Sequence, residues 1–277
     1  MTELPTRRVE ANGLTFSVVD AGEGPAVLLL HGFPDSSHLW RHQVPALVDA
    51  GYRVLAPDLR GFGESDRPEG VDQYAIPLVF MDVVALLDEA GVDRARVVGH
   101  DWGAGVAWTL ASLAPDRVER LVAISVGHPS AYFSLGGFEQ RERSWYMLFF
   151  QFEGVAEEGL RADDWRLLRE WAGGGDVERH VADLSRPGAL TAALNWYRAN
   201  IPPQAFTLGL GPELPPVRCP VMAVWSDGDH HCLEPQIKGS DRYVDGPFRY
   251  ERVHRASHWV PIDAPDRLNR LLVDFLA

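Results

Sequence analysis

Gly99-His100-Asp101-Trp102-Gly103 is the most informative segment of this sequence. It follows the strand-like run Arg96-Val97-Val98 and precedes a segment of helical composition, residues 104–114, so a strand, a tight turn and a helix are expected here. Glycines two residues before and two residues after Asp101 match the spacing of a nucleophile elbow, where the backbone bends so sharply that only small neighbours fit. Serine usually stands at the centre of this motif, whereas this chain has a carboxylate.

The residues on either side of the elbow predict alternating strands and helices. Apolar runs predict strands at residues 14–20, 26–30, 53–57 and 121–125, with helices between the later strands. This alternation predicts an α/β fold with a mostly parallel sheet flanked by helices. Ligands of such sheets lie beyond the carboxyl ends of the strands. Because His31-Gly32-Phe33-Pro34, the glycine-rich loop 58–66 and Asp101 all follow strands, we expect them to meet at one site.

The alternation of strands and helices stops after Pro129. From there the pattern is helical until strand patterns resume at residues 221–225 and 249–253, followed by a last helix. The chain is thus predicted to have an α/β core that carries an inserted helical cap lying over the site. The predicted domains are residues 1–129 and 217–277 for the core and residues 130–216 for the cap.

The composition limits the partners and the compartment. The 277 residues include 26 Lys and Arg against 39 Asp and Glu, and the net charge of −13 repels nucleic-acid phosphates and anionic membranes. No run reaches the ~18 apolar residues of a membrane span, and residues 1–13 lack the apolar centre of a signal peptide. Cys219 and Cys232 do not suggest a disulfide framework. We expect a cytoplasmic protein, monomeric or homodimeric, that neither binds nucleic acid nor inserts into membranes.

Two downstream residues can complete a catalytic constellation with Asp101. Asp229 lies just beyond the predicted strand 221–225, and His258 lies in the loop after the predicted strand 249–253. The chain order of nucleophile, acid and histidine is that of the α/β-hydrolase triad. Asp227 competes for the acid position, but the local pattern Trp225-Ser226-Asp227-Gly228-Asp229 favours Asp229.

The whole chain resembles the α/β-hydrolase fold, with its eight-stranded sheet, and specifically the soluble epoxide hydrolases. His31-Gly32-Phe33-Pro34 resembles their oxyanion-hole motif, residues 99–103 their elbow, and Ser257-His258-Trp259 their base position. These features are shared with haloalkane dehalogenases. A more specific resemblance lies in the cap segments 146–151 and 195–198, which resemble the segments that supply the family's paired tyrosines and contain Tyr146 and Tyr197.

This resemblance implies an epoxide hydrolase that makes vicinal diols from a small apolar epoxide and water. Asp101 would attack an epoxide carbon and form an alkyl ester, while Tyr146 and Tyr197 would give a proton to the leaving oxygen. His258, oriented by Asp229, would then activate the water that hydrolyses the ester. The reaction requires no metal ion and no organic cofactor.

Aromatic residues are expected at two further places in the site. Backbone N–H groups of Phe33 and Trp102 would stabilise the oxyanion that forms when water attacks the ester. An aromatic pocket would accept apolar aryl or alkyl epoxides. The expected lining residues are Phe33, Trp102, Phe149, Phe150 and Trp196.

Other interpretations compete with this one. A haloalkane or haloacid dehalogenase would use the same Asp-His-Asp triad, but a halide leaves without a proton, so N–H donors such as the indole of Trp102 would replace the phenols. A non-catalytic ligand receptor would need only the pocket. The cap aromatics also fit the buried stripe of an amphipathic helix. The run 229–232, with two histidines and a cysteine, is interpreted as a loop because adjacent residues rarely converge on one metal ion.

Overall fold

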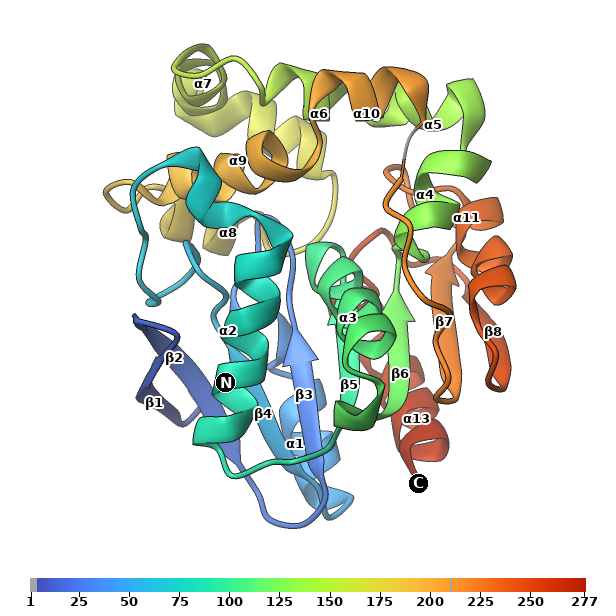
Figure 1. The fold of residues 1–277 in the computed structure, drawn as a ribbon. Helices are drawn as coiled ribbons and strands as arrows, with labels where there is room; N and C mark the ends of the chain where they lie inside the picture. Colours follow the sequence, from blue (N-terminus) through green and yellow to red (C-terminus); the bar gives the residue numbers. More distant parts are fainter. Residues whose placement is uncertain (1–3, 210) are drawn as a thin grey trace.

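The computed structural model describes residues 4–209 and 211–277 and contains an eight-stranded sheet (Figure 1). Its strand order is β1-β2-β4-β3-β5-β6-β7-β8. β2 pairs antiparallel with β1 and β4, and the other neighbours pair parallel. The predicted α/β fold with a mostly parallel sheet is therefore confirmed. The strands are β1 (Thr6–Ala11), β2 (Leu14–Ala21), β3 (Ala26–Leu30), β4 (Arg53–Pro57), β5 (Ala95–His100), β6 (Val118–Ile124), β7 (Val221–Ser226) and β8 (Phe248–Val253).

Helices cover both faces of the sheet. α2 and α3 lie on one face, and α1 and α13 lie on the other (Figure 1). Within residues 4–209 and 211–277, no helix combines the length and the hydropathy needed to span a membrane. The helices are α1 (Gln43–Asp49), α2 (Ile76–Glu89), α3 (Trp102–Leu113), α4 (Pro129–Leu135), α5 (Gly137–Arg143), α6 (Trp145–Phe149), α7 (Val155–Ala172), α8 (Val177–Leu184), α9 (Ala189–Asn200), α10 (Pro203–Leu208), α11 (Glu234–Lys238), α12 (Val260–Asp263) and α13 (Pro265–Leu276).

The central strands are buried on both faces because helices pack against each. Every residue of β3 and of β7 is buried, as expected for parallel strands between two helical layers. Successive side chains of β3 point to opposite layers. Leu28 and Leu30 pack with α2 and α3, whereas Val27 and Leu29 pack with α1 and α13. The carboxyl ends of these strands therefore form a rigid edge on which a site can be built.

The segment between β6 and β7 is helical in the described residues. Its helices, α4 to α10, lie over the carboxyl ends of the parallel strands (Figure 1). α4 begins at Pro129, one residue before the expected start of the cap. Residues 1–3 of the predicted core and residue 210 of the predicted cap lie outside the described residues. The division into core and cap at residues 130 and 216 stays a prediction.

Buried hydrogen bonds connect this helical segment to loops of the sheet. His180 Nε2, in α8, lies 2.8 Å from Oδ1 of Asp35, in the loop after β3. Trp196 Nε1, in α9, donates to the carbonyl oxygen of Arg60, in the loop after β4, at 3.1 Å. α8 and α9 are therefore fixed over the same strand ends that carry the candidate site.

Candidate active site

Asp101 occupies a strained turn between β5 and α3. Its φ of 54° and ψ of −123° lie outside the regions that L residues prefer. Its glycine neighbours make the turn possible, because a Cβ on Gly99 would lie 2.2 Å from the carbonyl oxygen of Gly103. A Cβ on Gly103 would lie 2.1 Å from the carbonyl oxygen of Leu30. The local geometry is that of the predicted elbow.

The loop after β3 directs a backbone N–H group at the Asp101 carboxylate. Phe33 N donates to Asp101 Oδ1 at 2.8 Å. This close approach requires Gly32, since a Cβ there would lie 2.2 Å from the same oxygen. The other expected donor, the N–H of Trp102, belongs to the first turn of α3, where backbone N–H groups have no partner within the helix and carry positive partial charge.

His258 lies between Asp101 and Asp229. Its Nδ1 is 2.9 Å from Asp229 Oδ2, and its Nε2 is 3.6 Å from Asp101 Oδ2. Asp229 Oδ1 accepts backbone hydrogen bonds from His231 and Cys232 at 2.8 and 2.9 Å. The structure thus brings the nucleophile, the histidine and the acid candidate together, with the acid fixed by three hydrogen bonds.

The competing carboxylate of Asp227 is bonded elsewhere. Its Oδ2 lies 2.6 Å from His254 Nδ1, and its Oδ1 accepts the N–H of Arg255 at 2.8 Å. Asp227 therefore belongs to a surface cluster, and Asp229 is the carboxylate that contacts His258.

The backbone carbonyl of His258 accepts two buried hydrogen bonds. His100 Nε2 and Ser125 Oγ each lie 2.9 Å from this oxygen. To donate here, His100 must carry its proton on Nε2. Burial lowers the pKa of His100 to about 4, so its ring is neutral near pH 7. Together the two residues fix the loop that carries the His258 imidazole.

The surrounding charges control the protonation of His258. Burial opposes its charged form, but the Asp229 carboxylate and the hydrogen bonds with Asp101 and Asp229 outweigh burial and raise the pKa of His258 well above its ordinary value. Against the effect of burial, the same ion pair lowers the pKa of Asp229. If Asp101 became a neutral ester, one cause of the raised pKa of His258 would disappear. The imidazole would then lose a proton more easily and could act as a base.

Tyr146 of α6 and Tyr197 of α9 are neighbours at the site. Their ring centroids are 5.9 Å apart, and their exposed fractions are 3% and 2%. Burial raises the pKa of both phenols well above 10, and the charge of Asp101 raises both pKa values further. Both phenols are therefore neutral near pH 7 and hold a proton that they can donate.

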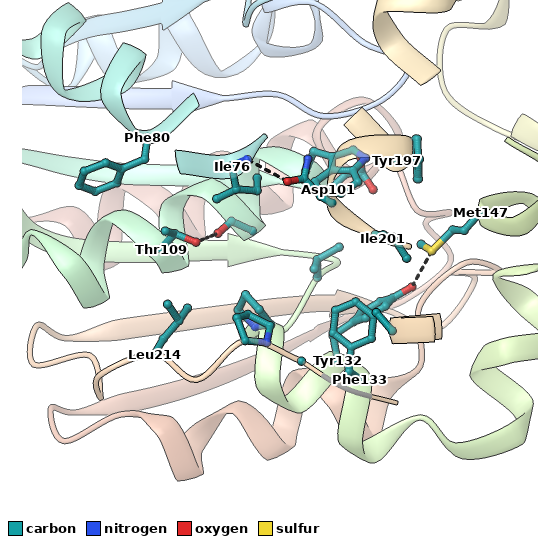
Figure 2. A pocket seen from close by; sticks show the side chains of 18 of the residues that line it. Ile76, Phe80, Asp101, Thr109, Tyr132, Phe133, Met147, Tyr197, Ile201 and Leu214 are labelled. Carbon is teal, nitrogen blue, oxygen red and sulfur yellow. Dashed lines mark hydrogen bonds between the residues drawn. The ribbon is translucent and has the colours of Figure 1, made fainter. Parts of the chain in front are cut away.

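Asp101 and the two phenols border one cavity of about 730 Å³ (Figure 2). Trp102 lines it as predicted, but the lining formed by the described residues does not include Phe33, Phe149, Phe150 or Trp196. Phe33 and Phe150 pack against Tyr197, and Phe149 packs against Phe150. The Trp196 indole donates a hydrogen bond to the Arg60 carbonyl. The pocket prediction is corrected for these four residues. The lining instead includes Ile76, Pro77, Phe80, Met81, Gly105, Thr109, Leu113, Val126, Pro129, Tyr132, Phe133, Met147, Asn200, Ile201, Pro202, Ala205, Gly211, Pro212, Leu214 and Cys232.

Sequence reasoning missed four polar residues of the described cavity wall, namely Thr109, Asn200, Tyr132 and Cys232, of which the last two follow strands of the sheet. Tyr132 follows β6, and its hydroxyl lies 3.0 Å from Ser144 Oγ. Cys232 follows β7 and forms, with Asp229 and His258, a group whose possible metal-ligand atoms all lie within 4.8 Å of one another. Since His258 Nδ1 already contacts Asp229 Oδ2, we assign this group to the triad. The only signal for Tyr132 or Cys232 was its position beyond the carboxyl end of a strand.

Comparisons with known proteins agree with this geometry. The family model described as alpha/beta hydrolase fold matches residues 25–232. A Bacillus subtilis protein named AB hydrolase superfamily protein YfhM is 37% identical over 97% of this chain and 96% of its own. Epoxide hydrolase A of Mycobacterium tuberculosis is 34% identical over 98% and 97% of the two chains. The crystal structure of epoxide hydrolase A from Mycobacterium thermoresistibile has a TM-score of 0.82 at 32% identity and 98% coverage of both chains.

Proposed function

Because this chain belongs to the α/β hydrolase fold family and, within it, to the epoxide hydrolases, we propose that it converts a small apolar epoxide and water to a vicinal diol through an ester on Asp101. The sequence resemblance to epoxide hydrolases is confirmed by these relatives. The observation that carries the proposed mechanism is that Asp101, Tyr146 and Tyr197 border one cavity, with His258 Nε2 3.6 Å from Asp101 Oδ2.

Ring opening is the first step of the proposed reaction. Asp101 Oδ1 accepts the Phe33 N–H, which leaves Oδ2 to attack an epoxide carbon. A carbon–oxygen bond of the ring breaks as the ester bond forms, and the leaving oxygen takes a proton from Tyr146 or Tyr197. Donation by a phenol fits this step because both tyrosines are neutral before the reaction and border the cavity on the cap helices.

Hydrolysis of the ester is the second step. Loss of the Asp101 charge lowers the pKa of His258, whose Nε2 then takes a proton from water while the water oxygen attacks Cγ of Asp101. Phe33 N–H stabilises the oxyanion on Oδ1, a contribution of ~2.7–4 kcal/mol for such a donor. Collapse of this intermediate breaks the bond between Cγ and the substrate oxygen, and that oxygen takes the second proton of the attacking water, which gives the diol and the Asp101 carboxylate. The His258 proton returns to the phenolate.

The other functions receive less support. A dehalogenase would share Asp101, His258 and Asp229, but its halide leaving group makes no use of the two phenols, and several relatives, among them the Mycobacterium tuberculosis protein, are named epoxide hydrolases. A non-catalytic receptor would not need the contacts of His258 with both carboxylates. The cytoplasmic location and the monomeric or homodimeric state rest on the sequence alone.

Phenol-to-phenyl substitutions test the proposed ring-opening step. The double variant Tyr146→Phe/Tyr197→Phe should lower the rate of diol formation by ~10²–10⁴-fold, because the alkoxide then leaves without a positioned acid. Tyr74→Phe is a matched control, since Tyr74 is also a buried phenol but its hydroxyl donates to the carbonyl of Pro68. Diol formation from styrene oxide is measured beside halide release from haloalkanes. Wild-type rates in the double variant, or halide release without diol, would contradict the proposal.

A further inference from the structure

The cavity follows one face of α3 away from the nucleophile. Asp101, Gly105, Thr109 and Leu113 all line it and are spaced four residues apart, so they form one stripe along the helix. At 1.5 Å per residue this stripe is roughly 18 Å long. Leu113, at its far end, is 52% exposed. The cavity therefore extends from the partly buried carboxylate of Asp101 toward the protein surface.

Figure 2 shows the two ends of this cavity. Tyr197 and Met147 lie on one side of it, whereas Phe80 and Leu214 lie on the other. Thr109 is placed on the side of Phe80 and Leu214. Gly105 lies one turn of α3 after Asp101 and one turn before Thr109. A substrate that is attacked at Asp101 and also fills the outer half must pass along Gly105.

Gly105 differs from the glycines that build the elbow. Side chains on Gly32, Gly99 or Gly103 would collide with neighbouring atoms at 2.2 Å or less, so packing requires glycine there. A Cβ on Gly105 would have no atom within 4 Å outside its own helical turn. Glycine is unfavourable inside a helix, and neither packing nor positive φ demands it at this position. What its missing side chain does is leave the cavity open beside the nucleophile.

In the outer half of the cavity, the polar side chains of the described lining residues are already hydrogen-bonded within the protein. Thr109 Oγ1 donates to the carbonyl of Gly105 at 2.9 Å. Asn200 donates to two backbone carbonyls and accepts the N–H of Ile76 at 2.8 Å. Among the described lining residues, Asp101 is the one carboxylate, and Lys, Arg and His are absent. A carboxylate on the substrate would lie against this lining without a cationic partner.

We propose that Gly105 determines substrate specificity by keeping the cavity open along α3, so that the enzyme prefers neutral epoxides with an extended apolar substituent. This inference rests on the proposed function and names the substrate class of the same site. The epoxide ring binds between Asp101 and the two phenols, and its substituent lies along Gly105 and Thr109 toward Leu113.

A graded series at Gly105 tests this assignment. The kcat/KM values are measured for the terminal epoxides of hexane and tetradecane with the wild type, Gly105→Ala and Gly105→Leu. The ratio of the long to the short substrate should exceed one in the wild type and fall by about tenfold or more in Gly105→Leu, because the added carbons occupy space needed by the long chain. Gly105→Ala is the matched control, since it removes the helical glycine with the least added volume and should change the ratio less.

Thermal unfolding of each variant separates specificity from folding. Gly105→Ala should unfold at or above the wild-type temperature because the added Cβ meets no atom within 4 Å outside its own helical turn, and Gly105→Leu, whose further carbons extend into the cavity, should remain folded. A folded Gly105→Leu variant with the wild-type ratio would overturn the proposal.

A separate measurement tests whether the enzyme prefers a neutral substrate to a charged one. An epoxide of octadecanoic acid should be turned over with a higher kcat/KM as its methyl ester than as its free acid, and an equal or higher value for the acid would overturn this part. If the wild type formed no diol from any of these epoxides, the proposed function itself would be wrong. If the enzyme formed diols but the substrate ratio did not change in Gly105→Leu, only the role of Gly105 would be wrong.

Discussion

Asp101 has two roles in the proposed reaction, and these explain the unusual elbow. As a carboxylate it attacks an alkyl carbon, and as an ester it presents the acyl carbon that water attacks. The Phe33 N–H contact at 2.8 Å serves the second role, because that oxygen becomes the oxyanion. The elbow therefore needs an oxyanion-hole donor even though its nucleophile is not serine.

Substitution of the acid residue should change the pH dependence of ester hydrolysis. Asp229→Asn removes the charge that raises the pKa of His258, so the pH at which hydrolysis reaches half its maximal rate should move to lower pH. The maximal rate should also fall by at least ~10²-fold, since the imidazole loses its orienting carboxylate. Rapid-quench measurement of the ester across pH checks both effects.

Asp227→Asn is the control for this substitution. Asp227 is two residues away in sequence but contacts His254 and Arg255 instead of His258. Its pH profile should match the wild type. If Asp227→Asn shifted the profile and Asp229→Asn did not, the assignment of the acid would be wrong.

The positions of the triad residues were predictable from the sequence, but the direction of each cap side chain was not. Asp229 and His258 follow strands, and parallel strands bring such residues to one edge. Trp196 and Tyr197 are adjacent in α9, yet the first is bonded to the Arg60 carbonyl and the second lines the cavity. Which face of a helix meets the cavity depends on packing between helices, and a single sequence does not determine it.

Among the elements, α6, α7 and α9 are joined by one buried ion pair. Arg198 of α9 donates to both Glu157 oxygens of α7 at 2.8 and 2.9 Å and to the Phe150 carbonyl after α6 at 2.8 Å. Tyr197 precedes Arg198, so this pair also helps to hold a proposed proton donor.

Breaking this ion pair should strongly destabilise the protein. Arg198→Ala leaves the Glu157 carboxylate buried without its partner, and we expect the free energy of unfolding to fall by ~3–5 kcal/mol. The double variant Glu157→Leu/Arg198→Leu should be less destabilised because no unpaired charge remains. Urea unfolding measures both.

Arg166→Ala provides the matched comparison for Arg198→Ala. Arg166 pairs with Asp163 where the backbone of α7 is interrupted by non-helical angles, and both side chains are mostly exposed, so little change is expected. Equal loss of stability in Arg166→Ala and Arg198→Ala would show that burial of the ion pair is not the cause.

The edge strand β1 shows a limit of prediction at the element scale. Residues 14–20 predict β2, but Thr6–Ala11 reads TRRVEA, and only two of its six residues are buried. Its strand conformation comes from pairing with β2 in a hairpin. A polar edge strand carries little apolar periodicity, whereas the buried β3 and β7 are continuous apolar runs that the sequence reveals directly.

For the whole molecule, buried neutral histidines should make stability depend on pH. Burial is the main cause that lowers the pKa of His100, His128 and His231 from 6.5 to about 4. Between these values the unfolded chain binds protons that the folded chain does not, so the free energy of unfolding should fall as pH decreases. The slope is at most about 1.4 kcal/mol per pH unit for each histidine.

Urea midpoints at pH 7 and pH 5 measure this acid lability. His258, whose pKa is raised, opposes this trend only above pH 6.5, because its stabilising contribution is fully present below that pH and is lost progressively as pH rises toward its folded pKa. Asp229 loses its contribution only below its ordinary pKa of 3.8. His128→Asn should lower the slope, and a midpoint that is unchanged or higher at pH 5 in the wild type would contradict the neutral state of these rings.

A single-turnover reaction in heavy-oxygen water tests the Asp101 ester. With enzyme in excess over epoxide, the account predicts that the first diol carries an unlabelled oxygen from Asp101 and that the heavy isotope appears in the peptide containing Asp101, as measured by mass spectrometry. Direct appearance of the heavy isotope in the first-turnover diol, with an unlabelled Asp101 peptide, would contradict the ester and the elbow's role as nucleophile.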